Sequence, residues 1–232
     1  MKEAWEKALR LMQNNDPMLK NIVNTTLEMS FASSITAFLI GVLIGLVVAF
    51  NEFPGKRIVV TFMRTLMGLP PVVVGIIVYV LFSGTGPFGS LGLIYSVKLM
   101  IIAQVVLITP IVAGMTETVL SPVIKNALPT LKGIGANPFK KLLLIIGESK
   151  YQLVAVYLFA FSRAISEVGA VQIVGGNILY KTRVMTTAIA LNYNTGDFSM
   201  AIALGFILLL ISLGVNCAAA VLQFGLKRKR NA

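Results

Sequence analysis

The chain has 232 residues, of which 56% are hydrophobic and 12% charged, and its mean hydropathy is +0.85. This composition is too apolar for a soluble domain, and the continuous apolar runs predict membrane-spanning helices rather than the short alternating strands of a β-barrel. A single cysteine, Cys217, and no histidine accompany a net charge of +11, which excludes an internal disulfide, a His/Cys metal site and nucleophile–histidine catalysis.

The N-terminal segment predicts a short amphipathic helix lying on the membrane surface. Trp5, Leu9 and Met12 recur at helical spacing among charged side chains, and Asp16-Pro17 breaks the pattern. We therefore expect this segment to precede the membrane-spanning part and to stay outside the hydrocarbon core.

The first predicted span covers about residues 26–50. It carries Gly41 and Gly45, whose small-xxx-small spacing lets two membrane helices approach closely. We interpret these glycines as a packing face rather than as ligand contacts.

Two further spans contain proline. The second, about residues 58–82, is interrupted at Pro70 and Pro71, because each proline removes a backbone donor and clashes with the preceding turn. The third, about residues 91–116, has a second predicted kink at Pro110.

A polar, lysine-bearing block at 121–150 separates the third span from the fourth. Connections between helices are usually a few residues long, so a loop of this length predicts a docking surface for a partner in the aqueous phase. Pro129 suits the first turn of a short helix, Gly135 can end that helix in a left-handed conformation, and Pro138 prevents its continuation. We expect this short helix to run parallel to the membrane.

The fourth predicted span, about 151–174, is followed by a loop at 175–197 and a fifth span at about 198–226. Five spans put the two ends on opposite sides. One side, with the turn at 51–57, Arg64 shortly after it, the polar block and the basic tail, collects twelve of the 20 Lys and Arg residues, against seven on the other side. Basic loops face the cytoplasm, so we expect an extracytoplasmic N-terminus and a cytoplasmic C-terminus. Basic residues beside spans indicate topology, not nucleic-acid binding.

The fourth span contains a pair of charged residues that could take part in function. Arg163 and Glu167 lie four residues apart and would share one helix face. Charges at mid-membrane cost about 2.5–3.5 kcal/mol each on insertion scales, so they must face protein, water or each other. They either neutralise each other to pin the helix, or Arg163 attracts an anion that Glu167 keeps from binding tightly. Ser166 and Gly169 belong to the same candidate pore site.

The predicted outer loop offers Lys181, Thr182 and Arg183, whose cations and hydroxyl suit a small oxyanion. A contact surface for a soluble partner is the alternative. The chain lacks a phosphate-binding P-loop, because Tyr180 stands where the second glycine before Lys181-Thr182 would be needed. We therefore expect ATP to be bound elsewhere.

The polar block resembles the cytoplasmic coupling loop of type I ABC importer permeases. Gly135 and Ala136 match that loop, whereas Pro129 and Thr130 replace its usual Glu and Ala, and Glu148 stands near its expected proline. By this resemblance the ATPase-coupling residues are Pro129, Thr130, Leu131, Lys132, Gly133, Ile134, Gly135, Ala136 and Asn137.

Other stretches are similar to the molybdate/tungstate branch of this family. These are GLPPVVVG at 68–75, GPFG at 86–89 and SRAISEVGAVQIVGGNI at 162–178. TRVMTTAIAL at 182–191 and GDFSMAIALG at 196–205 are most similar to tungstate-type permeases.

The resemblance implies an all-α, polytopic membrane bundle of about five transmembrane helices with a cytoplasmic coupling helix. It divides the chain into an amphipathic segment at 1–20, a permease domain at 22–226 and a basic tail at 227–232. It also implies a homodimer in a prokaryotic inner membrane, with a cytoplasmic ABC ATPase dimer docked on the loop and an extracytoplasmic oxyanion-binding protein. ATP and Mg would be bound by the ATPase, and this chain would carry no cofactor and no catalytic residue. We rank the substrates as tungstate, then molybdate, then sulfate.

A stand-alone secondary transporter or channel for a small anion is the alternative function. It would predict an internal repeat and ionisable relays in several spans. No repeat is visible, and only Arg163 and Glu167 lie well inside a predicted span. A membrane-embedded enzyme would need clustered carboxylates, whereas the nine acidic residues are scattered.

Overall fold

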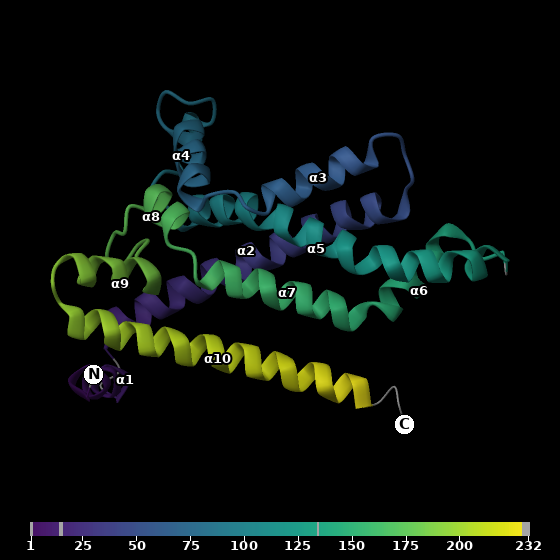
Figure 1. Cartoon of the computed structure of the whole chain (residues 1–232). Coiled ribbons are helices and arrows are strands. Elements are labelled where there is room, and N and C mark those ends of the chain that lie inside the picture. Colours follow the sequence, from purple (N-terminus) through teal and green to yellow (C-terminus); the bar gives the residue numbers. More distant parts are fainter. Residues whose placement is uncertain (1, 14–15, 134, 229–232) are drawn as a thin grey trace.

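The computed structural model describes residues 2–13, 16–133 and 135–228, and within these ranges it contains helices and no strand (Figure 1). The all-α prediction is confirmed. In chain order the elements are α1 (Lys2–Gln13), α2 (Pro17–Phe50), α3 (Lys56–Leu66), α4 (Pro71–Phe82), the 3₁₀ turn η1 (Gly89–Leu91), α5 (Val97–Gly133), α6 (Pro138–Glu148), α7 (Lys150–Ile165), α8 (Gly169–Gly175), α9 (Met185–Asn194) and α10 (Phe198–Arg228).

Three of the described helices, α2, α5 and α10, are long and apolar enough to cross a membrane alone. Two bent pairs pass the same test as single broken spans: α3 with α4, bent by 94°, and α6 with α7, bent by 68°. The structure therefore supports up to five spans by length and composition, as the sequence predicts.

The centre of the bundle is the close pair α2 and α5. An added Cβ on Gly41 would lie 2.6 Å from Val112 Cβ, and one on Gly45 would lie 2.6 Å from Thr116 Cβ. Such distances leave no room for a side chain, so the prediction that these glycines form a packing face is confirmed. Helix α7 closes the other side of this pair through a buried apolar cluster that includes Ala160.

The proline pair interrupts the second span as predicted. Pro70 precedes the first residue of α4, and Pro71 occupies its first turn, where a missing amide costs nothing. Helix α4 projects away from the long helices and packs against α8 (Figure 1), where an added Cβ on Gly75 would lie 2.8 Å from Ala170 Cα. Pro110 lies inside α5, and the kink there stays a prediction.

The polar block is not the loop that the sequence predicts. Helix α5 continues through Pro122 and Pro129 to Gly133, so the prediction that Pro129 begins a separate short helix is wrong. Both prolines are exposed and seven residues apart, so they lie on one helix face. The carbonyl that each leaves unpaired, such as that of exposed Lys125, can then be solvated instead of breaking the helix.

A tight turn joins α5 to α6. Gly135 has φ +65°, and the amide of Ala136 donates to Leu131 O at 3.1 Å, which ends α5 with the expected left-handed glycine. The Asn137 side chain then accepts from Lys140 N at 2.7 Å and caps α6. The polar block is thus a helical hairpin.

The fourth predicted span and the loop after it also need correction. Helix α7 ends at Ile165, a break follows, and α8 begins at Gly169, so 151–174 is not one helix. The predicted loop at 175–197 contains α9. Its first amide, that of Met185, donates to Thr26 Oγ1 on α2 at 2.9 Å. This long-range partner adds to a local one, in which Val184 N donates to Thr187 Oγ1 at 3.1 Å, and together they stabilise the start of the helix.

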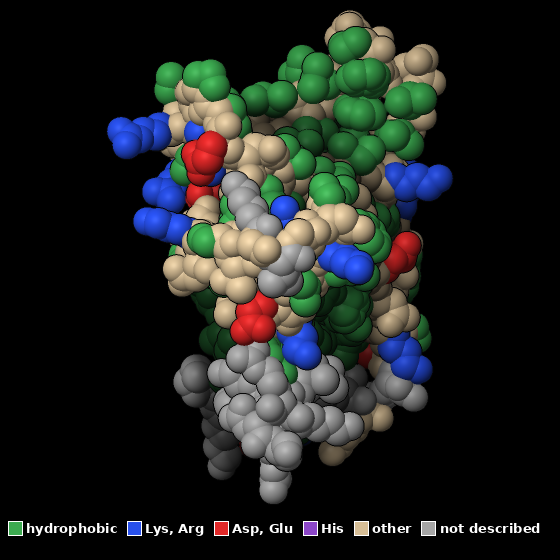
Figure 2. Space-filling model, turned by 90° about the vertical axis from the view of Figure 1, so that its right-hand side faces the viewer, with side chains coloured by type: hydrophobic (Ala, Val, Ile, Leu, Met, Phe, Trp, Pro, Cys, Tyr) green, Lys and Arg blue, Asp and Glu red, His purple; other side chains and the backbone are tan. Residues whose placement is uncertain are grey.

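The turn at 51–57, the α5–α6 hairpin and the C-terminal end of α10 lie together at one end of the molecule, whereas α1 and α9 lie at the other (Figure 1). Figure 2 faces the first of these ends and shows Lys and Arg side chains spread over it. The basic segments that the sequence assigns to one side of the membrane therefore share one end of the structure.

Helix α1 packs across the first half of α10. The Trp5 and Phe206 rings meet edge-on at 5.5 Å between centroids, and Lys7 Nζ lies 3.2 Å from Asp197 Oδ2. The Asp197 side chain also accepts from Met200 N at 2.9 Å. The hydrogen bond from Met200 N, and after it that from Lys7, hold the pKa of Asp197 below its ordinary value.

A carboxylate with a lowered pKa stabilises the fold above its ordinary pKa, and this contribution is lost as the pH falls through the folded-state value. Trp5 is the chain's one tryptophan. We expect its fluorescence to stay constant from neutral pH to about pH 5 and to shift toward that of exposed indole below about pH 4. Asp197→Asn, which keeps an acceptor for Met200 N, should show part of this shift at neutral pH. An equal shift in the control Glu6→Gln, on an exposed position of α1, would contradict a role for the ion pair.

Candidate functional site

The predicted pair Arg163 and Glu167 lies at the break between α7 and α8. Arg163 is in the last turn of α7, and Glu167 follows the end of that helix, so the two do not share a continuous helix face as the sequence predicts. They nevertheless form an ion pair, with Arg163 Nη1 2.5 Å from Glu167 Oε2. The carboxylate side chain is 2% exposed and the guanidinium side chain 27% exposed, so the positive end is the accessible one.

Glu167 is held by the chain on three sides. Its Oε1 accepts from Ala170 N at 3.1 Å, which caps the start of α8, and its backbone carbonyl accepts from Thr186 Oγ1 of α9 at 2.8 Å. Both carboxylate oxygens therefore have partners. A buried carboxylate in an apolar bundle is tolerated only under such conditions.

A series of buried hydrogen bonds from α2 through α5 holds the end of α7 in place. Gln104 of α5 donates through Nε2 to Ala164 O at 2.8 Å and accepts through Oε1 from Ser33 Oγ of α2 at 2.5 Å. Gln104 is fully buried. Gln104 was not predicted from the sequence, although an isolated amide in an apolar run, between Ala103 and Val105, is a signal for a buried interhelical hydrogen bond.

Gly169 brings α4 against the site. An added Cβ there would lie 2.9 Å from Val72 Cγ2 and 3.7 Å from Glu167 Oε1. Ser166 is exposed, and its hydroxyl donates to Ser162 O at 2.9 Å. The structure thus gathers three of the four predicted pore residues at one junction and turns the fourth outward.

A second Arg–Glu pair, which the sequence did not predict, joins α3 to α5. Arg64 Nη2 lies 3.6 Å from Glu117 Oε2, with the arginine side chain 59% and the glutamate side chain 9% exposed. Ser121 Oγ donates to Glu117 Oε1 at 2.9 Å. Glu117 falls one residue beyond the predicted third span, which is why it was not treated as an intramembrane charge.

The predicted outer-loop residues have separate environments. Lys181 is exposed, whereas Thr182 is buried and donates to Gly175 O at 2.5 Å. Arg183 is half-buried and donates through Nε to Asn177 Oδ1 at 3.1 Å. Thr182 and Arg183 therefore hold the turn after α8 in place, and Lys181 is free of these bonds.

The predicted coupling residues surround the tip of the α5–α6 hairpin. Leu131 is buried, Ala136 is half-buried, and Ile134 and the Lys132 side chain lie outside the described part of the chain. The apolar side of α6 beside the tip is bare, with Phe139 66% and Leu143 53% exposed. The exposed members of the predicted set are Pro129, Thr130, Gly133, Gly135 and Asn137.

Within the described residues, no group of three or more His, Cys, Asp or Glu side chains could hold a metal ion. The ionisable groups inside the bundle are instead Arg–Glu pairs with the arginine toward the outside. Such an arrangement can attract an anion without holding it as tightly as an unpaired arginine would.

The chain matches one protein family and several known transport proteins. A family model described as binding-protein-dependent transport system inner membrane component matches residues 41–228. The tungstate uptake system permease protein TupB of Peptoclostridium acidaminophilum is 37% identical and aligns over 95% of this chain and 97% of its own. A probable anion ABC transporter permease protein of Haloferax volcanii is 36% identical over 87% of this chain and 89% of its own. The sulfate transport system permease protein CysT of Salmonella typhimurium is 27% identical over 90% of this chain and 78% of its own.

Proposed function

The chain belongs to the family of binding-protein-dependent transport system inner membrane components, and on this premise we propose that it is the permease subunit of an ATP-driven importer for a tetrahedral oxyanion. The family assignment made from the sequence is thereby confirmed, and the chain is a multi-pass inner-membrane protein that works with an ATPase and a substrate-binding protein. The oxyanion, the stoichiometry and the coupling residues belong to the proposal.

Tungstate is the proposed substrate, ahead of molybdate and sulfate. The observation that favours tungstate over sulfate is the 37% identity to a tungstate uptake permease along almost the full length of both chains, against 27% for a sulfate permease, and molybdate stands between them on the sequence resemblance alone. The outward-facing guanidinium of Arg163 is compatible with a dianion.

We propose that two copies of this chain form the pore. In the single chain, the side of α4 away from α8 is bare, with Ile76 50%, Ile77 53% and Val80 56% exposed. Lipid could cover this surface, but it could not cover the polar side chains of neighbouring α3. A second copy packed on α4 would cover the bare side of that helix and leave the polar side chains of α3 facing the space between the two copies.

The hairpin end is the proposed cytoplasmic end, because basic segments gather there. The N-terminal end would then be extracytoplasmic. The bare apolar face of α6, at Phe139 and Leu143, and the exposed residues around Gly135 would seat the ATPase, which would bind ATP and Mg.

The test is to purify the chain with its ATPase and binding protein, reconstitute the complex in nanodiscs, and measure ATP hydrolysis. Binding protein loaded with tungstate should stimulate hydrolysis more than protein loaded with molybdate or sulfate, and the complex should contain two copies of the chain. Stimulation by none of the three anions, or anion uptake by the chain without an ATPase, would overturn the proposal and favour a secondary transporter or channel.

The coupling role predicts an effect at Gly135. Its φ of +65° is costly for a β-branched residue and acceptable for asparagine, although no neighbouring atom within 4 Å would clash with either. We expect Gly135→Val to deform the hairpin tip at a cost of about 1–2 kcal/mol and to uncouple ATP hydrolysis from uptake. Gly135→Asn should retain coupling. Full coupling in the valine variant, measured as anion imported per ATP hydrolysed, would count against this role.

A further inference from the structure

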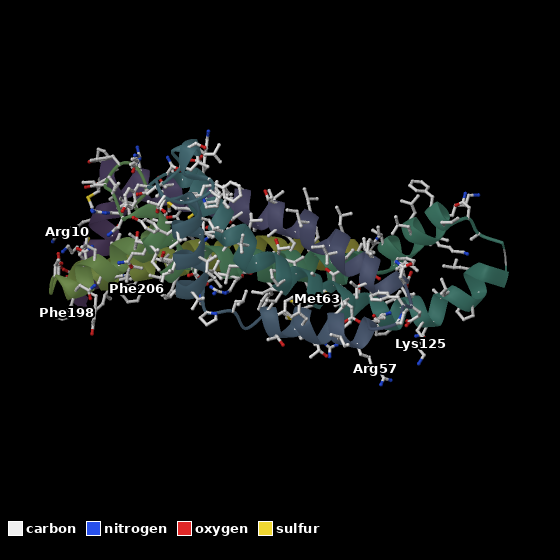
Figure 3. All side chains as sticks on the ribbon, turned by 90° about the horizontal axis from the view of Figure 1, so that it is seen from above. Arg10, Arg57, Met63, Lys125, Phe198 and Phe206 are labelled. Atoms are coloured by element: carbon white, nitrogen blue, oxygen red, sulfur yellow. The ribbon has the colours of Figure 1, made fainter. Side chains whose placement is uncertain are left out.

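One face of α3 carries a row of exposed polar side chains. Arg57, Thr61, Arg64 and Thr65 recur at i, i+4, i+7 and i+8, and all four are exposed. Met63 on another face of the same helix is buried against α2 and α5. Figure 3 shows Arg57 directed away from the bundle and Met63 toward it. We name the four residues the α3 polar stripe.

The α3 polar stripe occupies the first half of a broken membrane span. Arg64 lies about 10 Å further along the helix axis than Arg57, at 1.5 Å per residue. Guanidinium groups at this depth are not stable against hydrocarbon, so the face of α3 that carries them must face water or protein. Phe62 and Ile58, beside the stripe, are 61% and 75% exposed and provide an apolar edge on which protein can pack.

Glu117, the carboxylate that faces the stripe, has one oxygen without a hydrogen bond. Glu117 Oε1 accepts from Ser121, but Oε2 is buried without a hydrogen bond and faces Arg64 Nη2 across 3.6 Å. A cavity of about 760 Å³ lies between α3, the turn at 51–57 and Glu117, and it is bordered by Arg57, Thr61 and Arg64. Arg64 is therefore attracted to Glu117 and still free to bind a second anion.

We propose that the α3 polar stripe lines the inner half of the oxyanion path, with Arg64 as a transient binding residue. This inference rests on the proposed import of an oxyanion. A tetrahedral dianion can accept two hydrogen bonds from a guanidinium and a further one from Thr61, whereas the Thr65 hydroxyl already donates to Thr61 O at 3.0 Å. Glu117 offsets part of the Arg64 charge, so the anion is attracted and then released toward the basic end.

Whether anions reach the stripe can be tested in the reconstituted complex by comparing how fast introduced cysteines react with negatively and positively charged thiol reagents. Cys217 is the chain's one cysteine and is first replaced by alanine. Thr61→Cys and Thr65→Cys should react with a negatively charged methanethiosulfonate about tenfold faster than with a positively charged one, because the cations concentrate anions locally. Adding Arg64→Gln should remove most of this preference. Leu43→Cys, on a bare apolar position of α2, is the control and should be unreactive to both reagents.

Two outcomes would overturn the inference. If both stripe cysteines are as unreactive as Leu43→Cys, protein or lipid covers the stripe and no path runs along it. If they react but show no preference for the anionic reagent, the stripe is accessible to water but is not an anion path. Failure of the proposed function would look different: the wild-type complex would show no oxyanion-stimulated ATP hydrolysis, whatever the cysteines do.

Discussion

Arg163→Met is expected to destabilise the protein by about 3–5 kcal/mol, the largest effect of any single change considered. The variant removes the partner of Glu167, whose side chain is 2% exposed and cannot reach water. Glu167→Gln should cost less, because Arg163 is 27% exposed and can be solvated, and a glutamine oxygen can still accept from Ala170 N. Thermal unfolding of the detergent-solubilised chain measures both effects.

The double variant Arg163→Met/Glu167→Gln separates the two interpretations of the pair. It removes both charges and keeps the cap of α8, so most of the stability lost in Arg163→Met should return. If the pair only pins the helices, anion uptake by the reconstituted complex should return with it. Normal folding without uptake would instead place Arg163 in the anion path. Failure of the double variant to regain stability would contradict the ion-pair explanation itself.

Features that depend on local sequence were predictable. The apolar runs indicated about five spans, within the three to five that the length and composition of the described helices allow, the Pro70-Pro71 pair indicated the break in the second span, and Gly135 indicated the end of a helix. Each of these follows from a property of the residue itself: apolar length, a missing amide, or tolerance of positive φ.

Features that depend on distant partners were not predictable in the same way. Helix α9 begins where Thr26 accepts from Met185 N, and no local signal marks that contact. Pro129 was expected to begin a helix, yet α5 passes through it, because the face that would lose its hydrogen bond is exposed. In both cases the packing of the whole chain decides the outcome.

The same distinction applies to the candidate site. Arg163 and Glu167 were found because they are four residues apart, whereas Arg64 and Glu117 are 3.6 Å apart in space but lie on different helices. Spacing along one helix reveals the first pair. Only the packing of α3 on α5 reveals the second.

Gly45→Val is expected to prevent α2 and α5 from packing, with a loss of about 3 kcal/mol. The first atom added would lie 2.6 Å from Thr116 Cβ and 2.7 Å from Ala113 O, and a backbone carbonyl cannot rotate away as a side-chain end can. The two helices would have to separate along their shared face. Because α7 packs on both of them, the separation would also loosen the junction that holds Arg163.

Gly214→Val is the matched control, because Gly214 lies in the apolar helix α10, is exposed and has no atom within 4 Å of its added Cβ. Both variants change helix propensity equally, so the difference between their unfolding temperatures isolates the clash at Gly45. Gly45→Ala should fall between the two, since it adds the clashing Cβ without the two methyl groups. Equal stability of the two valine variants would mean that α2 and α5 are not in close contact at Gly45, and the packing on which the position of α7 depends would have to be redrawn.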